Sequence, residues 1–336
     1  MSSIKDVAKK AGVSISAVSK VFNGYTDVSE KTKEKVMVTA KELNYFPNIV
    51  AKNLSQKQTK TIALILSNFD EGCGPDGIIF KILSGILNAC VDNEYELLIF
   101  TTTQSQQQKK SYYQLCTERK VAGVIIFGLK TTDRYFKEIV ESRIHSVVID
   151  AEIVGKNTSS ISIDNVQAAK DGVNYLMKKG HRKIGFINGH RNAVVSMQRE
   201  EGYAYALREA NIEINADLVC EGDFEEDKAY LLAEEYLKKN KDVTAVFCAS
   251  DLMAIGFMRR CQELGINVPE QISILGFDDI DLSKYVTPTL STVRQEFYSM
   301  GYEATKLLIH SIKTGQFGEH KNLSQKIIDR NSVKDL

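Results

Sequence analysis

A glycine motif in the first half of the chain has the residue types of a dinucleotide-binding loop. Gly72-Cys73-Gly74-Pro75-Asp76-Gly77 matches G-x-G-x-x-G, whose backbone approaches a pyrophosphate at the start of a helix. It follows an apolar run at 61–66, and Asp92 and Glu94 stand about twenty positions on, where an acid would bind a ribose hydroxyl. Residues 68–72 separate the expected strand from the glycines, so the tight strand-to-helix turn is lost. An NAD-dependent dehydrogenase is therefore a distant alternative.

Other catalytic and metal-binding patterns are missing from the sequence. The five histidines, at positions 145, 181, 190, 310 and 320, have no metal-ligand spacing, and no G-x-S-x-G nucleophile motif occurs. The six cysteines include no C-x-x-C pair, which argues against a zinc ribbon or a disulfide scaffold and fits a reducing compartment. The acidic run 278–281 could bind a cation, but an acidic surface loop is the simpler interpretation. We therefore expect no enzyme, no metal and no cofactor.

The charge of the chain is balanced overall but divided between two parts. The 336 residues hold 43 basic and 43 acidic side chains. Residues 1–60 contain 11 lysines, no arginine and five acidic residues, a net charge of +6, which leaves −6 for residues 61–336. This asymmetry predicts a basic module that binds a polyanion, joined to an acidic body that does not. With no apolar run long enough for a membrane span and no signal-peptide core, we expect a cytoplasmic protein.

The basic segment has the pattern of three short helices. Ser3, with an acidic residue three positions later, forms a capping box for a first helix that Gly12 ends. Ser14 can cap a second helix that ends at Asn23-Gly24, and Ser29 a third, longer one. Two helices joined by a short glycine-containing turn form a helix-turn-helix, whose second helix enters the DNA major groove. The expected groove-facing positions are Ser14, Ile15, Ser16, Ala17 and Lys20.

From residue 61 the pattern changes to short apolar runs that alternate with amphipathic helical segments. This alternation is typical of parallel sheets buried between helices. A body of about 275 residues exceeds one doubly wound domain, so we expect two, which start near residues 61 and 183. The expected strands are 61–66, 96–100, 121–127, 146–149, 183–187, 245–248 and 272–277. The fold class is thus an all-α helix-turn-helix headpiece plus an α/β core of two doubly wound parallel-sheet subdomains.

Several sequence blocks resemble the LacI/GalR family of bacterial transcription regulators. In the basic segment they are 4–14, 18–24, 28–32 and 43–48. In the body they are 179–187, 199–203, 250–256 and 276–279. The resemblance covers nearly the whole chain, and its N-terminal block is the most specific part.

The resemblance implies a helix-turn-helix domain, a hinge helix and a periplasmic-binding-protein-like core whose two subdomains are joined by three crossings. The expected boundaries are 1–46 for the DNA-binding domain, 47–60 for the hinge helix and linker, 61–162 with 293–323 for the N-subdomain, and 163–292 with 324–336 for the C-subdomain. The sequence leaves no room for an additional tetramerising helix, so a homodimer is expected.

The resemblance also implies how the chain would contact double-stranded operator DNA. Ile15 and Ser16 occupy the chief base-reading positions and Lys20 a third; Ile15 can contact a thymine methyl group, and Lys20 can reach guanine O6 or N7. The segment has no arginine, so the bidentate fork on guanine is missing. Phosphate contacts are expected from Ser3, Ser14, Asn23 and Lys33. Leu54 aligns with a hinge-helix leucine that enters a central minor-groove step. The other expected hinge contacts are Ala51 and Lys52.

By the same resemblance, a small molecule binds between the subdomains at the carboxyl ends of strands. The implied effector-binding positions are Asp150, Arg199, Phe224, Asp251 and Asp278. An arginine, carboxylates and an aromatic ring suit a polyhydroxylated ligand, because charged groups bond its hydroxyls and the ring covers its apolar face. A helix N-cap is the alternative role for Asp251, and loop packing for Phe224. Ser250 replaces the family's usual Asn, and 68–80 lacks its usual Asn-Pro-aromatic-aromatic sequence, so the ligand class stays open.

These features predict a sequence-specific repressor whose operator affinity is controlled allosterically by a small molecule, a sugar or sugar derivative. A catabolite-control regulator driven by a partner phosphocarrier protein is the alternative within the family. The dehydrogenase is the more distant one.

Overall fold

The computed structural model describes residues 2–46, 59–69 and 76–336. The chain divides into two compact units, 1–60 and 61–336. The expected hinge contacts Ala51, Lys52 and Leu54 lie outside the described residues.

The first unit consists of three helices whose caps are encoded in the sequence. They are α1 (Ile4–Ala11), α2 (Ile15–Phe22) and α3 (Glu30–Glu42). The Ser3 hydroxyl accepts from the N–H of Asp6, whose carboxylate accepts from the N–H of Ser3, which completes the predicted capping box. Gly12 ends α1 in the left-handed conformation, with φ 61°, and Ser14 and Ser29 cap α2 and α3 as predicted.

A small apolar core holds these three helices together. Val7, Val18 and Val36, one from each helix, are fully buried at its centre. Phe22 at the end of α2 packs edge-on against Tyr45, with ring centroids 5.7 Å apart. Because the apolar face of α2 is used in this core, its opposite face is left on the surface.

The first sheet of the core unit is parallel throughout, in the order β11-β5-β4-β3-β1-β2. Its strands are β1 (Thr61–Ser67), β2 (Glu96–Thr102), β3 (Gly123–Phe127), β4 (Ser146–Ile149), β5 (Thr158–Ile163) and β11 (His320–Leu323). The helices around it are α5 (Ile78–Asp92), α6 (Gln104–Lys109), α7 (Tyr112–Arg119), α8 (Arg134–Glu141) and α13 (Phe297–Thr314). Successive residues of β1 alternate between two cores: Ile62 packs on the α5 and α13 side, and Ala63 on the α7 and α8 side.

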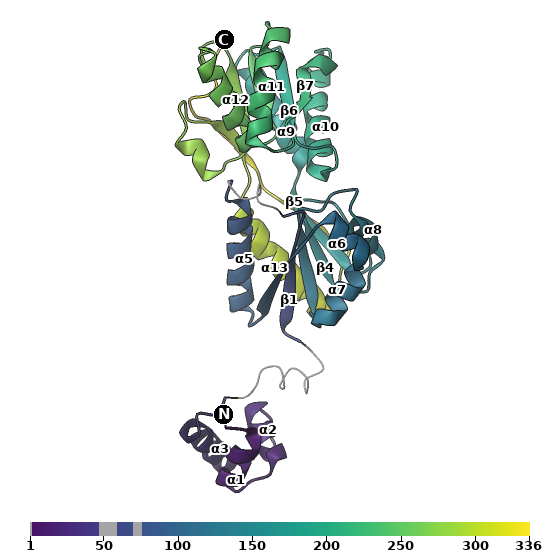
Figure 1. The fold of residues 1–336 in the computed structure, drawn as a ribbon, viewed down its shortest axis with the longest axis vertical. Helices are drawn as coiled ribbons and strands as arrows, with labels where there is room; N and C mark the ends of the chain where they lie inside the picture. The colour runs from purple at the N-terminus through teal and green to yellow at the C-terminus, as the bar shows by residue number, and fades with distance from the viewer. Residues whose placement is uncertain (1, 47–58, 70–75) are drawn as a thin grey trace. The chain divides into compact units, whose positions relative to one another are not determined.

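Helices α5 and α13 lie side by side on one face of this sheet (Figure 1). They meet closely at Gly85 and at Gly301, where an added Cβ would lie 2.1 Å from the carbonyl oxygen of Tyr298 and of Ile82, respectively. Only glycine allows this approach at either position, so the two helices pack with their backbones in contact.

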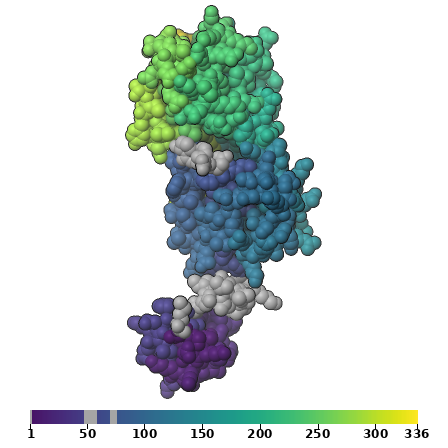
Figure 2. Space-filling view, in the orientation of Figure 1, coloured from purple at the N-terminus to yellow at the C-terminus, as the bar shows by residue number. Residues whose placement is uncertain are grey.

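The second sheet has the order β12-β10-β9-β8-β6-β7, and only the β10–β12 pair is antiparallel. Its strands are β6 (Ile184–Asn188), β7 (Val219–Glu221), β8 (Ala245–Cys248), β9 (Ser273–Asp278), β10 (Ser291–Arg294) and β12 (Lys326–Ile328). Its helices are α9 (Asn165–Lys178), α10 (Val194–Glu209), α11 (Glu226–Lys239) and α12 (Asp251–Glu263), with α9 packed on α10 and α11 on α12. The two subdomains of the core unit appear as a blue and a green body in Figure 2.

The chain passes between the subdomains three times, from β5 into α9, from β10 into α13, and from β11 into β12. β5 and β10 are parallel members of opposite sheets, and each leaves its own sheet at the carboxyl end to enter the other subdomain (Figure 1). The carboxyl ends of the two sheets therefore face each other, which is where open α/β sheets bind ligands.

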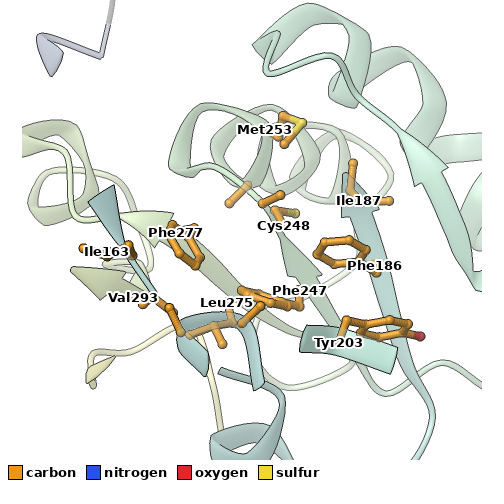
Figure 3. Close-up of a cluster of buried hydrophobic side chains, with 14 of the residues drawn as sticks. Ile163, Phe186, Ile187, Tyr203, Phe247, Cys248, Met253, Leu275, Phe277 and Val293 are labelled. Atoms are coloured by element: carbon orange, nitrogen blue, oxygen red, sulfur yellow. The ribbon is translucent and has the colours of Figure 1, made fainter. Parts of the chain in front are cut away.

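A row of aromatic rings crosses the core of the C-subdomain (Figure 3). The centroid of Phe186 lies 5.0 Å from that of Tyr203 and 5.4 Å from that of Phe247, which lies 6.3 Å from Phe277. All four rings are buried. The row extends from α10 across β6 and β8 to β9, and Phe277 lies one residue before the end of β9.

All seven expected strands are confirmed, each with ends within two residues of the expectation. β5, β7, β10, β11 and β12 were not among these seven. β5 reads Thr-Ser-Ser-Ile-Ser-Ile, yet all six residues are buried. Its hydroxyls are satisfied inside the protein; Thr158 donates to the carbonyl of Ile139 at 3.1 Å, for example. Buried, hydrogen-bonded serines give a central strand without the usual apolar pattern.

Candidate functional site

The α2 helix presents most of the expected DNA-reading residues on the surface. The Oγ of its N-cap, Ser14, accepts from the N–H of Ala17 at 3.1 Å and lies 2.9 Å from the Oγ of Ser16. The Ile15 side chain is 46 % exposed, Ser16 and Lys20 are exposed, and Ala17 is half-buried. Ile15, Ser16 and Lys20 are therefore accessible together on one surface.

Other expected DNA contacts already have partners within the headpiece. The Lys20 ammonium lies 2.5 Å from a carboxylate oxygen of Asp27, which was not among the expected site residues. Lys33 pairs with Glu30 at 2.6 Å, and the Asn23 amide donates to a neighbouring serine at 3.3 Å. DNA must compete with these partners or leave them in place.

In the core unit, Arg199 is buried beside the carboxyl end of the second sheet. Its Nε donates to Asn165 Oδ1 at 2.9 Å and its Nη1 to the carbonyl of Ala249 at 2.6 Å. The guanidinium carbon lies 3.7 Å from the ring centroid of Phe277, the last ring of the aromatic row. Burial lowers the pKa of Arg199 against the opposing effect of acidic neighbours, but an arginine remains charged.

Two of the expected carboxylates lie near this arginine. Asp278 Oδ1 is 3.9 Å from Arg199 Nη1 and accepts from Gln295 Nε2 at 2.7 Å. Asp150 follows β4 in the other subdomain and accepts from the Ser162 hydroxyl at 3.2 Å. Burial raises the pKa of Asp150, and that of Asp278 well above its usual range, while Arg199 partly lowers both. One buried cation thus faces two carboxylates from opposite subdomains.

One of the two roles considered for Asp251 needs correction. The N-cap alternative is wrong, because Ser250 is the N-cap of α12. The fully buried Asp251 carboxylate accepts from the N–H of Ile280 at 2.9 Å and from the hydroxyls of Ser283 and Thr292 at 2.6 Å each. It joins the start of α12 to β10 and to the segment after β9, so three donors from the protein already bind its oxygens. Burial raises its pKa to about 7 despite the three donors.

Phe224 packs between two loops at the carboxyl ends of neighbouring strands. It follows β7 with φ 66°, and its ring lies against Gly189, where an added Cβ would be 2.0 Å from the ring. Its edge meets the His190 ring, with centroids 5.5 Å apart. The alternative of loop packing is therefore correct for one side of the ring, and the residue as a whole is half-buried.

Three further residues near the carboxyl end of the second sheet were missed from the sequence. Gln295 Oε1, Ser196 Oγ and His190 Nδ1 are buried atoms without a hydrogen-bond partner among the described residues. Ser196 lies one turn before Arg199 on the buried face of α10, and this spacing could have revealed it. Gln295 follows β10, whose mixed sequence gave no strand signal. Unpaired buried polar atoms are costly unless a ligand or water satisfies them.

The described part of the glycine motif starts helix α5. Asp76 Oδ1 accepts from the N–H of Ile78 at 3.0 Å, and Gly77 has φ 69°. Across 2–46, 59–69 and 76–336, no group of histidine, cysteine and acidic residues is arranged to hold a metal ion. Within the same ranges, no helix has the length and apolar character needed to cross a bilayer.

Two family models match the chain. The model of bacterial regulatory proteins of the lacI family matches residues 3–48, and that of a periplasmic binding protein-like domain matches residues 173–333. The first contains α1 to α3, and the second contains all six strands of the second sheet together with α13.

Relatives and solved structures match over the full length. The HTH-type transcriptional repressor PurR of Vibrio campbellii (strain ATCC BAA-1116) is 33 % identical over 100 % of both chains. A structure of the lac repressor dimer bound to operator and the anti-inducer ONPF matches with a TM-score of 0.85 and 26 % identity over 99 % of both chains. A complex of the transcriptional regulator CelR with cellobiose matches with a TM-score of 0.76 and 28 % identity, over 99 % of this chain and 100 % of that one. With a helix-turn-helix headpiece, a two-subdomain core and this full-length similarity, the chain belongs to the LacI family of bacterial regulatory proteins and is a DNA-binding transcriptional repressor.

Proposed function

We propose that this repressor binds a two-fold-symmetric operator as a cytoplasmic homodimer and that a small, uncharged, polyhydroxylated molecule controls its affinity. The molecule would bind where the carboxyl ends of the two sheets face each other. The observation that carries the proposal is the buried Arg199–Asp278–Gln295 group with Asp150 beside it. Nothing in this group favours the alternative of a regulator driven by a phosphocarrier protein.

The hydrogen-bonding state of this group favours a ligand that both donates and accepts hydrogen bonds, as hydroxyl groups do. Two of the Arg199 donors are used by Asn165 and Ala249. Gln295 Oε1 has no partner among the described residues, and the two carboxylates offer further acceptor capacity. Hydroxyl groups of a sugar can donate to all of these acceptors, and the exposed side of Phe224 can cover an apolar sugar face.

The charge of this group argues against anionic effectors. Arg199 is the cation of this group, and Asp278 and Asp150 beside it are acidic groups whose pKa values burial raises. A phosphate would bring its own negative charge into this buried site against two acidic groups, and Arg199 would have to offset all of it, which is unfavourable. Neutral sugars are therefore preferred over sugar phosphates. The CelR–cellobiose complex, similar in fold, supports the same class.

An exposed apolar face on α5 and α13 supports the homodimer. Phe80 is 74 % exposed and Val91 76 %, and with Leu87 they fall on one side of α5, at spacings of seven and four. Tyr298 on the adjacent α13 is also exposed. A contiguous apolar surface of this kind marks an interaction site. A second copy of the same face would bury it in an isologous contact.

Control of DNA binding would pass through relative motion of the subdomains. The pair Lys81–Asp281, at 3.3 Å, joins α5 to the short 3₁₀ helix η2 (Asp281–Lys284) of the other subdomain. Asp279 accepts from Arg294 and Arg330, both at 2.5 Å, and so fixes the crossing after β10. An effector that stabilises one arrangement needs only about 1–3 kcal/mol of coupling to change operator affinity about 5- to 150-fold. The signal would reach DNA through residues 47–60.

A thermal-shift screen with neutral sugars, sugar phosphates and purines tests this assignment. A neutral sugar at about 100 times its Kd should add about 2.7 kcal/mol of stability, a rise of several degrees in Tm. The Arg199→Ala variant should lose this shift, and Arg208→Ala, which changes an exposed arginine of the same helix, should keep it. A shift with sugar phosphates alone, or an unchanged sugar response in Arg199→Ala, would contradict the proposed site.

A further inference from the structure

We propose that Asp27 is a further specificity-determining residue of the headpiece and that Asp27 and Lys20 together read one G·C base pair. The inference rests on the proposed placement of α2 in the major groove. It adds a residue that belongs to no helix of the helix-turn-helix.

The recognition helix has few groups that can distinguish bases. Lys20 is the only charged residue of α2. Ile15 can contact only a methyl group, and the Ser16 hydroxyl is nearly indifferent to the base it meets. Most of the hydrogen-bonding specificity of α2 must therefore come from Lys20.

The Lys20 ammonium is not alone on this surface. Asp27 Oδ2 lies 2.5 Å from Lys20 Nζ, and the two side chains are 56 % and 47 % exposed. The turn after α2 brings Asp27 to this position: the N–H of Tyr25 donates to the carbonyl of Lys20 at 3.1 Å, and Gly24 has φ 73°. Any groove edge within reach of the ammonium is also within reach of the carboxylate.

The pair matches the major-groove edge of a G·C base pair. Guanine O6, an acceptor, and the cytosine N4 amino group, a donor, lie about 2.9 Å apart, because they are hydrogen-bonded to each other. An ammonium has three N–H donors, so one can bind O6 while another stays on Asp27. The carboxylate can accept from the cytosine amino group at the same time. The Lys20–Asp27 contact therefore need not break on binding.

Other base pairs fit this arrangement less well. In the reversed C·G pair the carboxylate would face guanine O6, and acceptor would meet acceptor. In a T·A pair the same two positions hold thymine O4, an acceptor, and the adenine amino group, a donor, so this pair is disfavoured only through the thymine methyl group that takes the place of guanine N7. Such unfavourable contacts add specificity by weakening binding to wrong sequences. The hydrogen bond from Lys20 lowers the pKa of Asp27, so this carboxylate is ionised at neutral pH.

The test measures base preference with the full-length protein and a library of symmetric duplexes with randomised half-sites. The variants are Asp27→Asn, Lys20→Gln and the double variant. Glu42→Gln is the matched control, because Glu42 is an acidic residue of the same headpiece that pairs with Lys10 at 2.9 Å and is similarly exposed. Circular dichroism checks that each variant is folded.

Wild-type protein should prefer G·C over C·G at one half-site position by about 5- to 150-fold. Asp27→Asn and Lys20→Gln should both lose this preference at the same position, and the double variant should lose no more than either. Asp27→Asn should also bind other sequences more tightly, with a salt exponent steeper by about 0.9, since one anionic group has been removed. Glu42→Gln should leave every base preference unchanged.

The proposal is overturned if Asp27→Asn keeps every base preference of the wild type. An Ile15→Ala variant separates this failure from failure of the groove placement. If Ile15→Ala alters preferences and Asp27→Asn does not, only the role of Asp27 is refuted. If neither variant alters them, or the wild type selects no half-site, the placement of α2 fails as well.

Discussion

Replacing Asp251 by asparagine should change how the stability of this protein depends on pH. Burial raises the pKa of Asp251 to about 7, whereas the unfolded chain has the ordinary value near 3.8. A carboxyl group whose pKa is raised in the folded state stabilises the fold when protonated, and this stabilisation is lost as pH rises through the folded pKa. Asparagine has nearly the same shape but cannot ionise.

The size of the effect follows from the two pKa values. A difference of about three units corresponds to about 4 kcal/mol over the full titration. From about pH 4.5 to about pH 8, ionisation of Asp251 should lower the free energy of unfolding of the wild type by about 3 kcal/mol. The rest of the ~4 kcal/mol lies below about pH 4.5, where the carboxyl group of the unfolded chain is still partly protonated. The Asp251→Asn variant should therefore gain about 3 kcal/mol relative to wild type over this range.

Urea denaturation at several pH values, followed by tyrosine fluorescence, measures this difference. Asp281→Asn is the control, because hydrogen bonds from Lys284 and Lys81 lower the pKa of Asp281. Its relative stability should fall, not rise, as pH increases through the acidic range. If the free energy of unfolding of the wild type and of Asp251→Asn changed with pH in the same way, the conclusion that burial raises the pKa of Asp251 would be refuted.

Three further outcomes are expected. Arg199→Ala should abolish the effector response in an operator-binding anisotropy assay but retain effector-free operator binding; a fully responsive variant would exclude Arg199 from the site. Leu54→Ala should weaken operator binding measured by gel shift and leave effector affinity unchanged, since the expected wedge contacts only DNA; equal operator affinity would remove the wedge hypothesis. Val91→Asp should dissociate the dimer in sedimentation velocity, because it places a charge at the exposed apolar face, whereas Val154→Asp, at another exposed valine, should not. A dimeric Val91→Asp protein would rule out the α5–α13 face.

The fold class could be predicted because most strands have a strong local signal. Residues 62–66 and 245–248 are unbroken apolar runs, and both lie in buried strands. β5 and β10 differ because they are the strands that cross between subdomains. They are rich in serine and threonine, whose hydroxyls bond to partners far away in the sequence, as Thr292 does to Asp251. A sequence window cannot contain such partners, so pattern reasoning fails at the crossings.

The candidate site shows the same limit at the level of single residues. Motifs located Arg199 and Asp278, which the fold does bring together. The motif around Asp251 was equally suggestive, but three donors from elsewhere in the C-subdomain occupy its carboxylate. Gln295 was missed because it belongs to no motif and acquires its position from the crossing after β10. Residue type indicates what a group can do, and the number of partners it already has decides whether it is available.

In the headpiece, ion pairs between acidic residues and lysines divide the lysines into those expected to set base preference and those expected to set the general affinity for DNA. Among residues 2–46, which the structure describes, three acidic side chains pair with lysines, in Lys10–Glu42, Lys20–Asp27 and Lys33–Glu30. A lysine that stays paired with a carboxylate when DNA binds adds little net positive charge. The sequence-independent attraction to DNA phosphates must then come mainly from the lysines outside these three pairs, which give the segment its net charge of +6. The salt dependence of operator binding should then report those lysines, and base preference should report Lys20 with Asp27. Because the two properties rest on different residues, a substitution can change sequence choice and general affinity in opposite directions, as expected for Asp27→Asn.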